Sequence, residues 1–269
     1  MARVLREGAF EGETHIVTGA AQGIGRAVAT ALAEHGAQVM LVDLDEGRLA
    51  EAADEIGTLA RVKPIFAAAN VAEETHVQRA VGRALEATGV VNGVVNVAGI
   101  TRDARIPKKS FDDFKLVVGV HLYGTFLFLR EVAAQCWHVQ FKNAGNQPLD
   151  DDVNRFVVNF SSVSARNGNV GQIDYTAAKG AIESATRTAA REFSAYRARV
   201  NAIAPGPVNT PMLAAVGAAG IEAMGRATLT GRIAEPADMA HFVCALADPK
   251  ISGYVTGQVF QVNGGMYLA

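Results

Sequence analysis

The chain has few cysteines and few charged residues for its length of 269. Cys136 and Cys244 lie far apart, and neither has a Cys or His neighbour at metal-ligand spacing, which argues against a disulfide framework or a metal site. Both cysteines are expected to pack in the core. Charged residues make up 19% and the formal net charge is -2, so the chain lacks the basic surface typical of nucleic-acid-binding proteins.

Long apolar runs are also lacking. A bilayer-spanning helix needs roughly 18 or more consecutive apolar residues. The nearest candidate, Leu116–Leu129, is broken by His121 and Thr125, so it predicts a buried helix and no membrane association. The segment Met1–Glu13 has no apolar core of the kind found in a secretory signal, which favours the cytoplasm.

Short apolar runs alternate with longer Ala-rich amphipathic stretches, a pattern typical of repeated βα units and a parallel sheet. Because several strand runs are apolar without clean alternation, helices are expected on both faces, which gives a doubly wound Rossmann-type α/β fold. The expected strands are His15–Thr18, Gln38–Val42, Arg61–Phe66, Gly93–Val97, Arg155–Phe160, Arg199–Ala204 and Val259–Val262. The expected helices are Ile24–His35, Glu46–Ile56, Glu73–Thr88, Phe111–Val139, Tyr175–Tyr196 and Pro236–Ala247.

No Pro/Ser-rich linker and no repeat of fixed period divides the chain, so residues 1–269 are expected to form a single domain. Its only long polar interruption, Gln140–Asn154, includes three consecutive aspartates and is expected to be a surface excursion between a helix and a strand.

A glycine-rich turn, Thr18–Gly25, follows the first strand and leads into a helix. Small residues let the backbone approach a pyrophosphate, and the helix N-terminus stabilises its charge. Asp43 closes the next strand 18 residues beyond Gly25, where a carboxylate accepts hydrogen bonds from adenosine ribose hydroxyls. Its charge repels a 2′-phosphate, so NAD is expected rather than NADP. The alternative is a surface carboxylate at a strand end.

Two further strand ends carry asparagine. Asn70-Val71 and the segment Asn96–Gly99 each follow an apolar run, at the carboxyl edge where open α/β sheets bind ligands. Contact with the cofactor and simple capping of a turn both remain open for each asparagine.

A tyrosine and a lysine define a second candidate site. Tyr175 and Lys179 are four residues apart and share one helical face, where the ammonium can favour the phenolate. Ser161 and Ser162 leave the fifth strand, placed to donate a hydroxyl to a substrate oxygen. On its own, such a Tyr/Lys pair is usually only helix surface.

In combination, these motifs resemble the short-chain dehydrogenase/reductase family from about Phe10 to the end of the chain. Ser162 lies thirteen residues before Tyr175, as in that family. The resemblance implies that Tyr175 is the general acid/base, that Ser162 orients the substrate oxygen and that Lys179 lowers the tyrosine pKa. It implies a cofactor site made of Thr18, Gly19, Gln22, Gly23, Ile24, Gly25, Asp43, Leu44, Asn70, Val71, Asn96, Ala98, Gly99, Tyr175, Lys179, Pro205, Gly206, Val208 and Thr210.

Two positions depart from the family pattern. His121 stands where the family usually has the asparagine of a proton relay, and we expect it to take over that role. Because imidazole titrates near neutral pH, the same hypothesis predicts an acid limb of activity set by His121. Asn70 replaces a common aspartate, and its amide still suits adenine.

The resemblance implies interconversion of a ketone and a secondary alcohol. Gly99–Asp103 and Val120–Phe126 look most like 3-oxoacyl-thioester reductases and 3-hydroxyacyl dehydrogenases, so an acyl thioester of coenzyme A or acyl carrier protein is the expected substrate. The small apolar segment Met212–Gly220 is expected to be a mobile lid. Four cations are either contacts for an anionic carrier or solvated surface charges: Arg102, Arg105, Lys108 and Lys109.

Other functions stay open from the sequence. They are a sugar, polyol or steroid alcohol dehydrogenase, a nucleotide-sensing binding protein on the same fold, and a structural scaffold. The long apolar helices Phe111–Val139 and Tyr175–Tyr196 carry more apolar surface than one sheet face covers, which predicts a homotetramer or at least a dimer.

Overall fold

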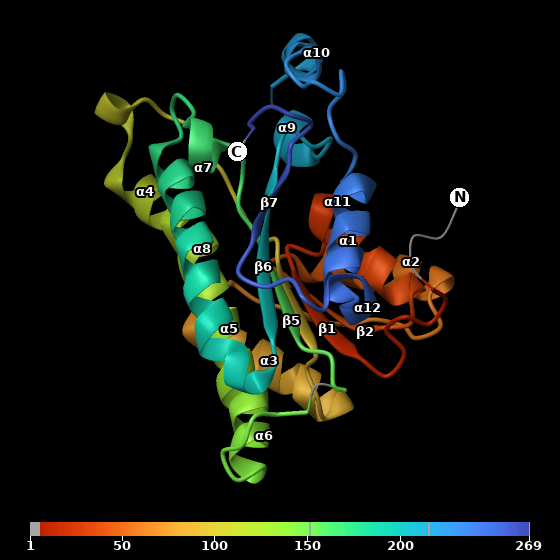
Figure 1. Cartoon of the computed structure of the whole chain (residues 1–269). Coiled ribbons are helices and arrows are strands. Elements are labelled where there is room, and N and C mark those ends of the chain that lie inside the picture. Colours follow the sequence, from red (N-terminus) through yellow and green to blue (C-terminus); the bar gives the residue numbers. More distant parts are fainter. Residues whose placement is uncertain (1–5, 151, 215, 269) are drawn as a thin grey trace.

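Seven parallel strands form one sheet in a computed structural model of the chain, in the order β3-β2-β1-β4-β5-β6-β7 (Figure 1). The structure describes residues 6–150, 152–214 and 216–268. The order reverses between β1 and β4, the switch point at which doubly wound sheets bind ligands. The strands are β1 (Thr14–Thr18), β2 (Gln38–Asp43), β3 (Ile65–Ala68), β4 (Gly93–Asn96), β5 (Phe156–Phe160), β6 (Arg199–Pro205) and β7 (Val259–Val262).

Helices cover both faces of this sheet (Figure 1). One apolar core lies under α1, α2 and α11, and a second lies under α3, α5 and α8, which confirms the doubly wound architecture. The helices are α1 (Gly23–Glu34), α2 (Glu46–Leu59), α3 (Glu74–Thr88), α4 (Phe111–Val118), α5 (Gly124–Val132), α6 (His138–Asn143), α7 (Ser164–Asn167), α8 (Ile173–Glu192), α9 (Pro211–Ala214), α10 (Ala218–Arg226), α11 (Pro236–Ala247) and α12 (Pro249–Ser252).

The elements α4, α5 and α6 belong to one long helix, Phe111–Asn143. Two π-helical turns, Gly119–Tyr123 and Ala133–Trp137, separate them. Its length and apolar composition alone would suit a membrane span, but 61% of its most apolar 18-residue window is buried inside the protein, as in a core helix. Such π turns are often found at functional sites, and the first one carries His121.

Two segments differ from their predictions. β3 begins at Ile65 rather than Arg61, because the side chains of residues 61–63 point to solvent. The stretch Gln140–Asn154 is only partly a surface excursion: the long helix continues to Asn143 and Leu149 is buried. The polar composition of Gln140–Asn154 predicted neither the continued helix nor the buried Leu149. Cys136 and Cys244 are both buried, as expected.

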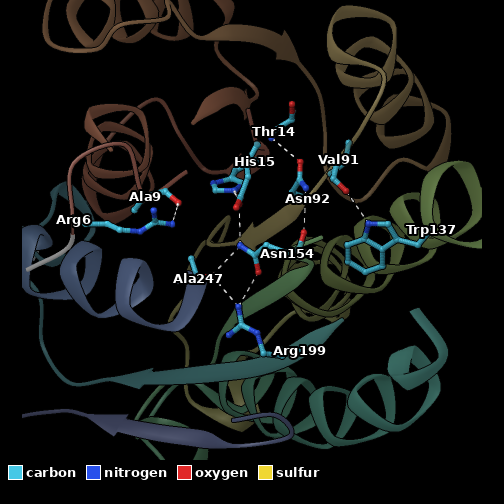
Figure 2. A network of polar contacts seen from close by, with 11 residues as sticks. Arg6, Ala9, Thr14, His15, Val91, Asn92, Trp137, Asn154, Arg199 and Ala247 are labelled. Atoms are coloured by element: carbon cyan, nitrogen blue, oxygen red, sulfur yellow. Dashed lines mark hydrogen bonds and ion pairs between the residues drawn. The ribbon is translucent and has the colours of Figure 1, made fainter. Parts of the chain in front are cut away.

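A network of hydrogen bonds joins the amino-terminal ends of the strands, opposite the switch-point edge (Figure 2). Arg199, at the start of β6, donates to Leu246 O at 2.6 Å, Ala247 O at 2.9 Å and Asn154 Oδ1 at 3.0 Å. Asn154 O accepts from Asn92 Nδ2 at 3.1 Å. These hydrogen bonds therefore connect the amino-terminal ends of the strands to the C-terminal end of α11.

Candidate active site

A cavity of about 550 Å³ opens at the carboxyl ends of the strands. Ser162, Tyr175, Lys179 and His121, which come from three separate segments, all line it. The fold therefore brings the four proposed catalytic side chains to one place. Residues predicted to hold the cofactor also line the cavity: Ile24, Gly99, Pro205, Gly206, Val208 and Thr210.

Tyr175 and Lys179 lie one turn apart on α8, with Lys179 Nζ 5.6 Å from the centre of the Tyr175 ring. Burial raises the pKa of Tyr175, and a hydrogen bond with Ser162 opposes that rise. Lys179 donates to Phe160 O at 2.5 Å, and burial lowers its pKa to about 7. Lys179 is not among the groups that shift the pKa of Tyr175 in this structure, so the lowering of that pKa by the lysine ammonium stays a prediction.

The two adjacent serines have different roles. The Ser161 hydroxyl donates to Glu183 Oε1 at 3.0 Å, and Glu183 is itself buried and paired with Arg166. The Ser162 hydroxyl faces the cavity, where it bonds to Tyr175 and accepts from Ser164 N at 3.2 Å. Ser162 is therefore the serine available to a substrate oxygen.

His121 packs edge-on against Tyr175, with ring centres 5.0 Å apart. Its Nε2 lies 3.1 Å from Ile100 N and 2.8 Å from Ile100 O, while its buried Nδ1 has no partner. Burial, aided by the charge of Lys179, lowers the pKa of His121 to about 3. This lowered pKa argues against the expected acid limb near neutral pH, because burial penalises the charged imidazolium.

The glycine turn after β1 forms a tight cradle. A Cβ on Gly25 would lie 2.1 Å from Gly19 O, so only glycine fits there. Gly19 has φ +67° and approaches the Ala98 backbone closely. Asp43 accepts from Ala21 N at 3.1 Å and Leu44 N at 2.7 Å, which fixes the carboxylate beside the turn. These features fit a dinucleotide, since no side chain caps the start of α1 and the free amides of a helix N-terminus bind phosphate.

Several predicted cofactor residues are used within the fold. Thr18 Oγ1 accepts from Val97 N and Ala98 N at 3.0 and 3.1 Å, which joins the ends of β1 and β4. Asn96 Nδ2 donates to Asn159 Oδ1 at 2.9 Å, although Asn96 Oδ1 has no partner. The remaining side chains have these placements: Asn70 Oδ1 accepts from Ala72 N, Gln22 Oε1 accepts from Arg48, Val71 is buried and Leu44 is exposed.

The cavity has a polar side and an apolar side, and its lining residues Gln172, Met224 and Met266 were not singled out from the sequence. Asp103 accepts from Gln172 Nε2 at 2.9 and 3.1 Å beside Tyr175, and Asp103 adds to the raised pKa of that tyrosine. No spacing rule connects these positions, because the fold alone brings them together. The apolar side is formed by Met212, Leu213, Val216, Met224 and Met266, partly from the predicted lid, whose mobility stays a prediction.

The four predicted surface cations do not behave alike. Arg102, Arg105 and Lys108 are exposed. Lys109 is not a surface charge, because its side chain is 5% exposed and pairs with Asp174. Among the described residues, no group of three His, Cys, Asp or Glu side chains is placed to hold a metal.

Comparison with known proteins identifies the family. A family model described as enoyl-(acyl carrier protein) reductase matches residues 19–267. The chain belongs to the short-chain dehydrogenase/reductase family. It is 33% identical to a 3-oxoacyl-(acyl-carrier-protein) reductase of Thermotoga maritima, over 96% of this chain and 99% of that protein. It is 34% identical to a (3R)-3-hydroxyacyl-CoA dehydrogenase of Canis lupus familiaris, over 94% and 95%, and 36% identical to the short-chain reductase NovJ of Streptomyces niveus, over 93% and 92%.

As a short-chain dehydrogenase/reductase, the protein is an oxidoreductase that acts on CH–OH groups with a nicotinamide cofactor. Its relatives are named for the 3-oxoacyl and 3-hydroxyacyl forms of acyl substrates, which supports the predicted ketone and alcohol chemistry.

Proposed function

We propose that this chain interconverts 3-oxoacyl and 3-hydroxyacyl thioesters with NAD(H). The observation that carries the proposal is the convergence of Ser162, Tyr175 and Lys179 on one cavity beside the glycine cradle. The apolar methionine-rich side of that cavity suits an acyl chain, and its open mouth leaves room for a bulky thioester carrier.

The side chains act on the substrate oxygen. Tyr175, a neutral phenol at working pH, donates its proton to the oxygen of a ketone, and as phenolate it removes the hydroxyl proton in the reverse direction. Ser162 holds that oxygen by hydrogen bonding. Lys179, with a pKa of about 7, takes up or releases a proton at Nζ next to the tyrosine. The bound nicotinamide supplies or accepts the hydride.

We infer a preference for NAD from Asp43. Its carboxylate is fixed at the end of β2 by two backbone amides, so it cannot easily turn away from a ribose. A 2′-phosphate beside it adds a repulsion that should cost more than about 1.4 kcal/mol, or tenfold in affinity. Residues of the cradle and the cavity hold the cofactor in this proposal: Gly19, Gln22, Gly23, Ile24, Gly25, Asp43, Gly99, Pro205, Gly206, Val208 and Thr210.

We infer that His121 positions the catalytic groups as a neutral side chain. It replaces the family's relay asparagine and contacts both Ile100 and the Tyr175 ring. Its unpartnered Nδ1 is available to a water or a relay partner, which keeps the predicted relay role as a proposal.

The experiment is a substrate panel with both cofactors. NADH or NADPH absorbance is followed with 3-oxoacyl thioesters, 2-enoyl thioesters, and sugar, polyol and steroid ketones, and cofactor affinities are titrated by fluorescence. We expect thioester ketone reduction with NADH, at least tenfold tighter NADH binding, and no turnover in Tyr175→Phe. Reduction only of enoyl thioesters or sugars, or cofactor binding without any turnover, contradicts the proposal.

Three further expectations accompany this function and stay predictions. They are a single domain over residues 1–269, a cytoplasmic location, and a homotetramer or dimer.

A further inference from the structure

A buried ion pair lies next to the catalytic tyrosine. Lys109 Nζ is 2.8 Å from Asp174 Oδ2, and the two side chains are 5% and 1% exposed. Lys109 also donates to the carbonyl oxygen of Arg102. Lys109 stands just before α4, and Asp174 immediately precedes Tyr175 in α8. The pair therefore connects the cavity-lining segment 101–109 to the helix that carries the catalytic groups.

Tyr175 occupies an intrinsically weak part of α8. It is the third residue of the helix, and the first four amides of a helix have no carbonyl partner within it. Asp174 Oδ1 accepts from Tyr175 N at 2.9 Å and so provides one missing acceptor. The other carboxylate oxygen is held by Lys109. Lys179, one turn further on, is fixed independently through Phe160 O.

Two hydrogen bonds lie beside the ion pair. Ala104 N donates to Gly171 O at 3.0 Å, and Gln172 Nε2 donates to Asp103. Both join the segment 101–109 to the turn before α8, but both are at more exposed positions than the ion pair. A buried carboxylate that loses its cation is strongly destabilised. Loss of the Lys109–Asp174 ion pair should therefore disturb the first turn of α8 more than loss of either hydrogen bond.

We propose that Lys109 and Asp174 are positioning residues that act as a unit to hold Tyr175 in its catalytic place. The inference rests on the proposed function in so far as Tyr175 is the general acid/base. Because Lys179 and the glycine cradle are secured elsewhere, the pair governs kcat rather than cofactor affinity.

The test is a double-mutant cycle with Lys109→Met and Asp174→Asn. We expect each single variant and the double variant to lose at least tenfold in kcat, with the NADH Kd unchanged within threefold. Residues that act as one unit give a double variant no worse than the worse single variant. Lys115→Met, which removes an exposed lysine paired with Asp112, is the matched control and keeps wild-type kcat.

Hydrogen exchange measured by mass spectrometry tests, without substrate, whether the Lys109–Asp174 pair acts as a tether between residues 101–109 and the first turn of α8. Lys109→Met should speed amide exchange in residues 101–109 and 173–176, whereas Lys115→Met should not. If Lys109→Met does not fold, Asp174→Asn carries the same test, because its amide oxygen still accepts from Tyr175 N. Wild-type kcat in both single variants, lower thermal stability alone, or losses that multiply in the double variant overturn the proposal.

The two hypotheses fail separately. A wild-type protein that turns over no thioester contradicts the proposed function, while the exchange experiment still decides the tether. An inactive Tyr175→Phe together with a fully active Lys109→Met contradicts the tether and leaves the proposed function intact.

Discussion

At the residue scale, burial sets the charge of the two basic side chains in the cavity. Lys179 and His121 are 4% and 2% exposed, and burial is the main cause of the lowered pKa in each. Removing a cation from water penalises its charged form, and nearby Lys179 adds repulsion at His121. A lysine with a pKa of about 7 exchanges protons at working pH, whereas a histidine with a pKa of about 3 does not titrate there.

The free energy of unfolding at acid pH should depend on the buried His121. Its pKa is about 3 in the folded chain and near the ordinary 6.5 when unfolded, so the unfolded state binds the proton first as pH falls. The free energy of unfolding should therefore fall from pH 6.5 to pH 3, with roughly 5 kcal/mol as the upper bound of this contribution. Urea unfolding of wild type and His121→Asn at several pH values measures it. Parallel pH profiles for the two proteins would contradict the buried neutral histidine.

Substitution of His121 should also separate positioning from titration. His121→Asn keeps a donor and an acceptor for Ile100 and should retain most turnover, with an unchanged pH profile from 5 to 9. Neutral Nε2 either donates to Ile100 O or accepts from Ile100 N, and His121→Leu loses that bond, which should lower kcat at least tenfold at every pH. Steady-state kinetics across that range give the result, and wild-type kcat in the leucine variant would make His121 a packing residue.

At the element scale, the β1-to-α1 turn determines whether a dinucleotide fits. The turn tolerates no side chain at Gly25, because Gly19 O occupies the place of a Cβ. Gly180 provides a contrast: it lies on α8, and nothing stands within 4 Å of its Cβ position. One glycine is required by a close approach, and the other is merely tolerated in a helix.

Alanine at these two glycines should have opposite effects. Gly25→Ala must displace the turn and should weaken NADH binding at least tenfold. Gly180→Ala should leave the NADH Kd unchanged and raise the free energy of unfolding by about 0.5–1 kcal/mol, since alanine favours helix. Fluorescence titration and urea unfolding measure both effects. Wild-type affinity in Gly25→Ala would show that the turn does not hold the cofactor.

At the scale of the whole molecule, the two ends of the sheet have separate tasks. The carboxyl ends carry the cavity, while the amino ends carry the hydrogen-bond network around Arg199 (Figure 2). Burial lowers the pKa of Arg199, yet the guanidinium is stabilised by several carbonyl acceptors. Stability and catalysis should therefore respond to different mutations.

Arg199→Leu should destabilise the protein without changing the chemistry. The substitution removes the guanidinium donor from Asn154 Oδ1 and from the carbonyls of Leu246 and Ala247, which keep only Ser252 and Asn154 as donors, and this should cost about 1–3 kcal/mol. Urea unfolding gives the loss, and kcat with the NADH Kd of the folded protein should stay within twofold of wild type. A large change in kcat of the fully folded Arg199→Leu protein would contradict this separation of stability from catalysis.

Assembly should depend on the long helix. Phe111, Tyr123 and Phe126 on it are large side chains that are 72%, 53% and 53% exposed, so they are available to a second copy of the chain. Pairing of two copies along this face would cover them. Light scattering should give a multiple of the 28.2 kDa mass, and Phe126→Asp should lower it. A monomer at micromolar concentration contradicts the assembly prediction.

The sequence by itself determined the order of strands and helices, the glycine turn and the Ser162, Tyr175 and Lys179 set. Each of these depends on local periodicity or fixed spacing: apolar runs predicted the strands, and one helical turn joins Tyr175 to Lys179. Only the tertiary structure decided the charge of His121, the hydrogen bond of Ser161 to Glu183 and the pairing of Lys109 with Asp174. The physical reason is that burial and long-range contacts set these properties, and neither follows from the neighbours of a residue in the chain.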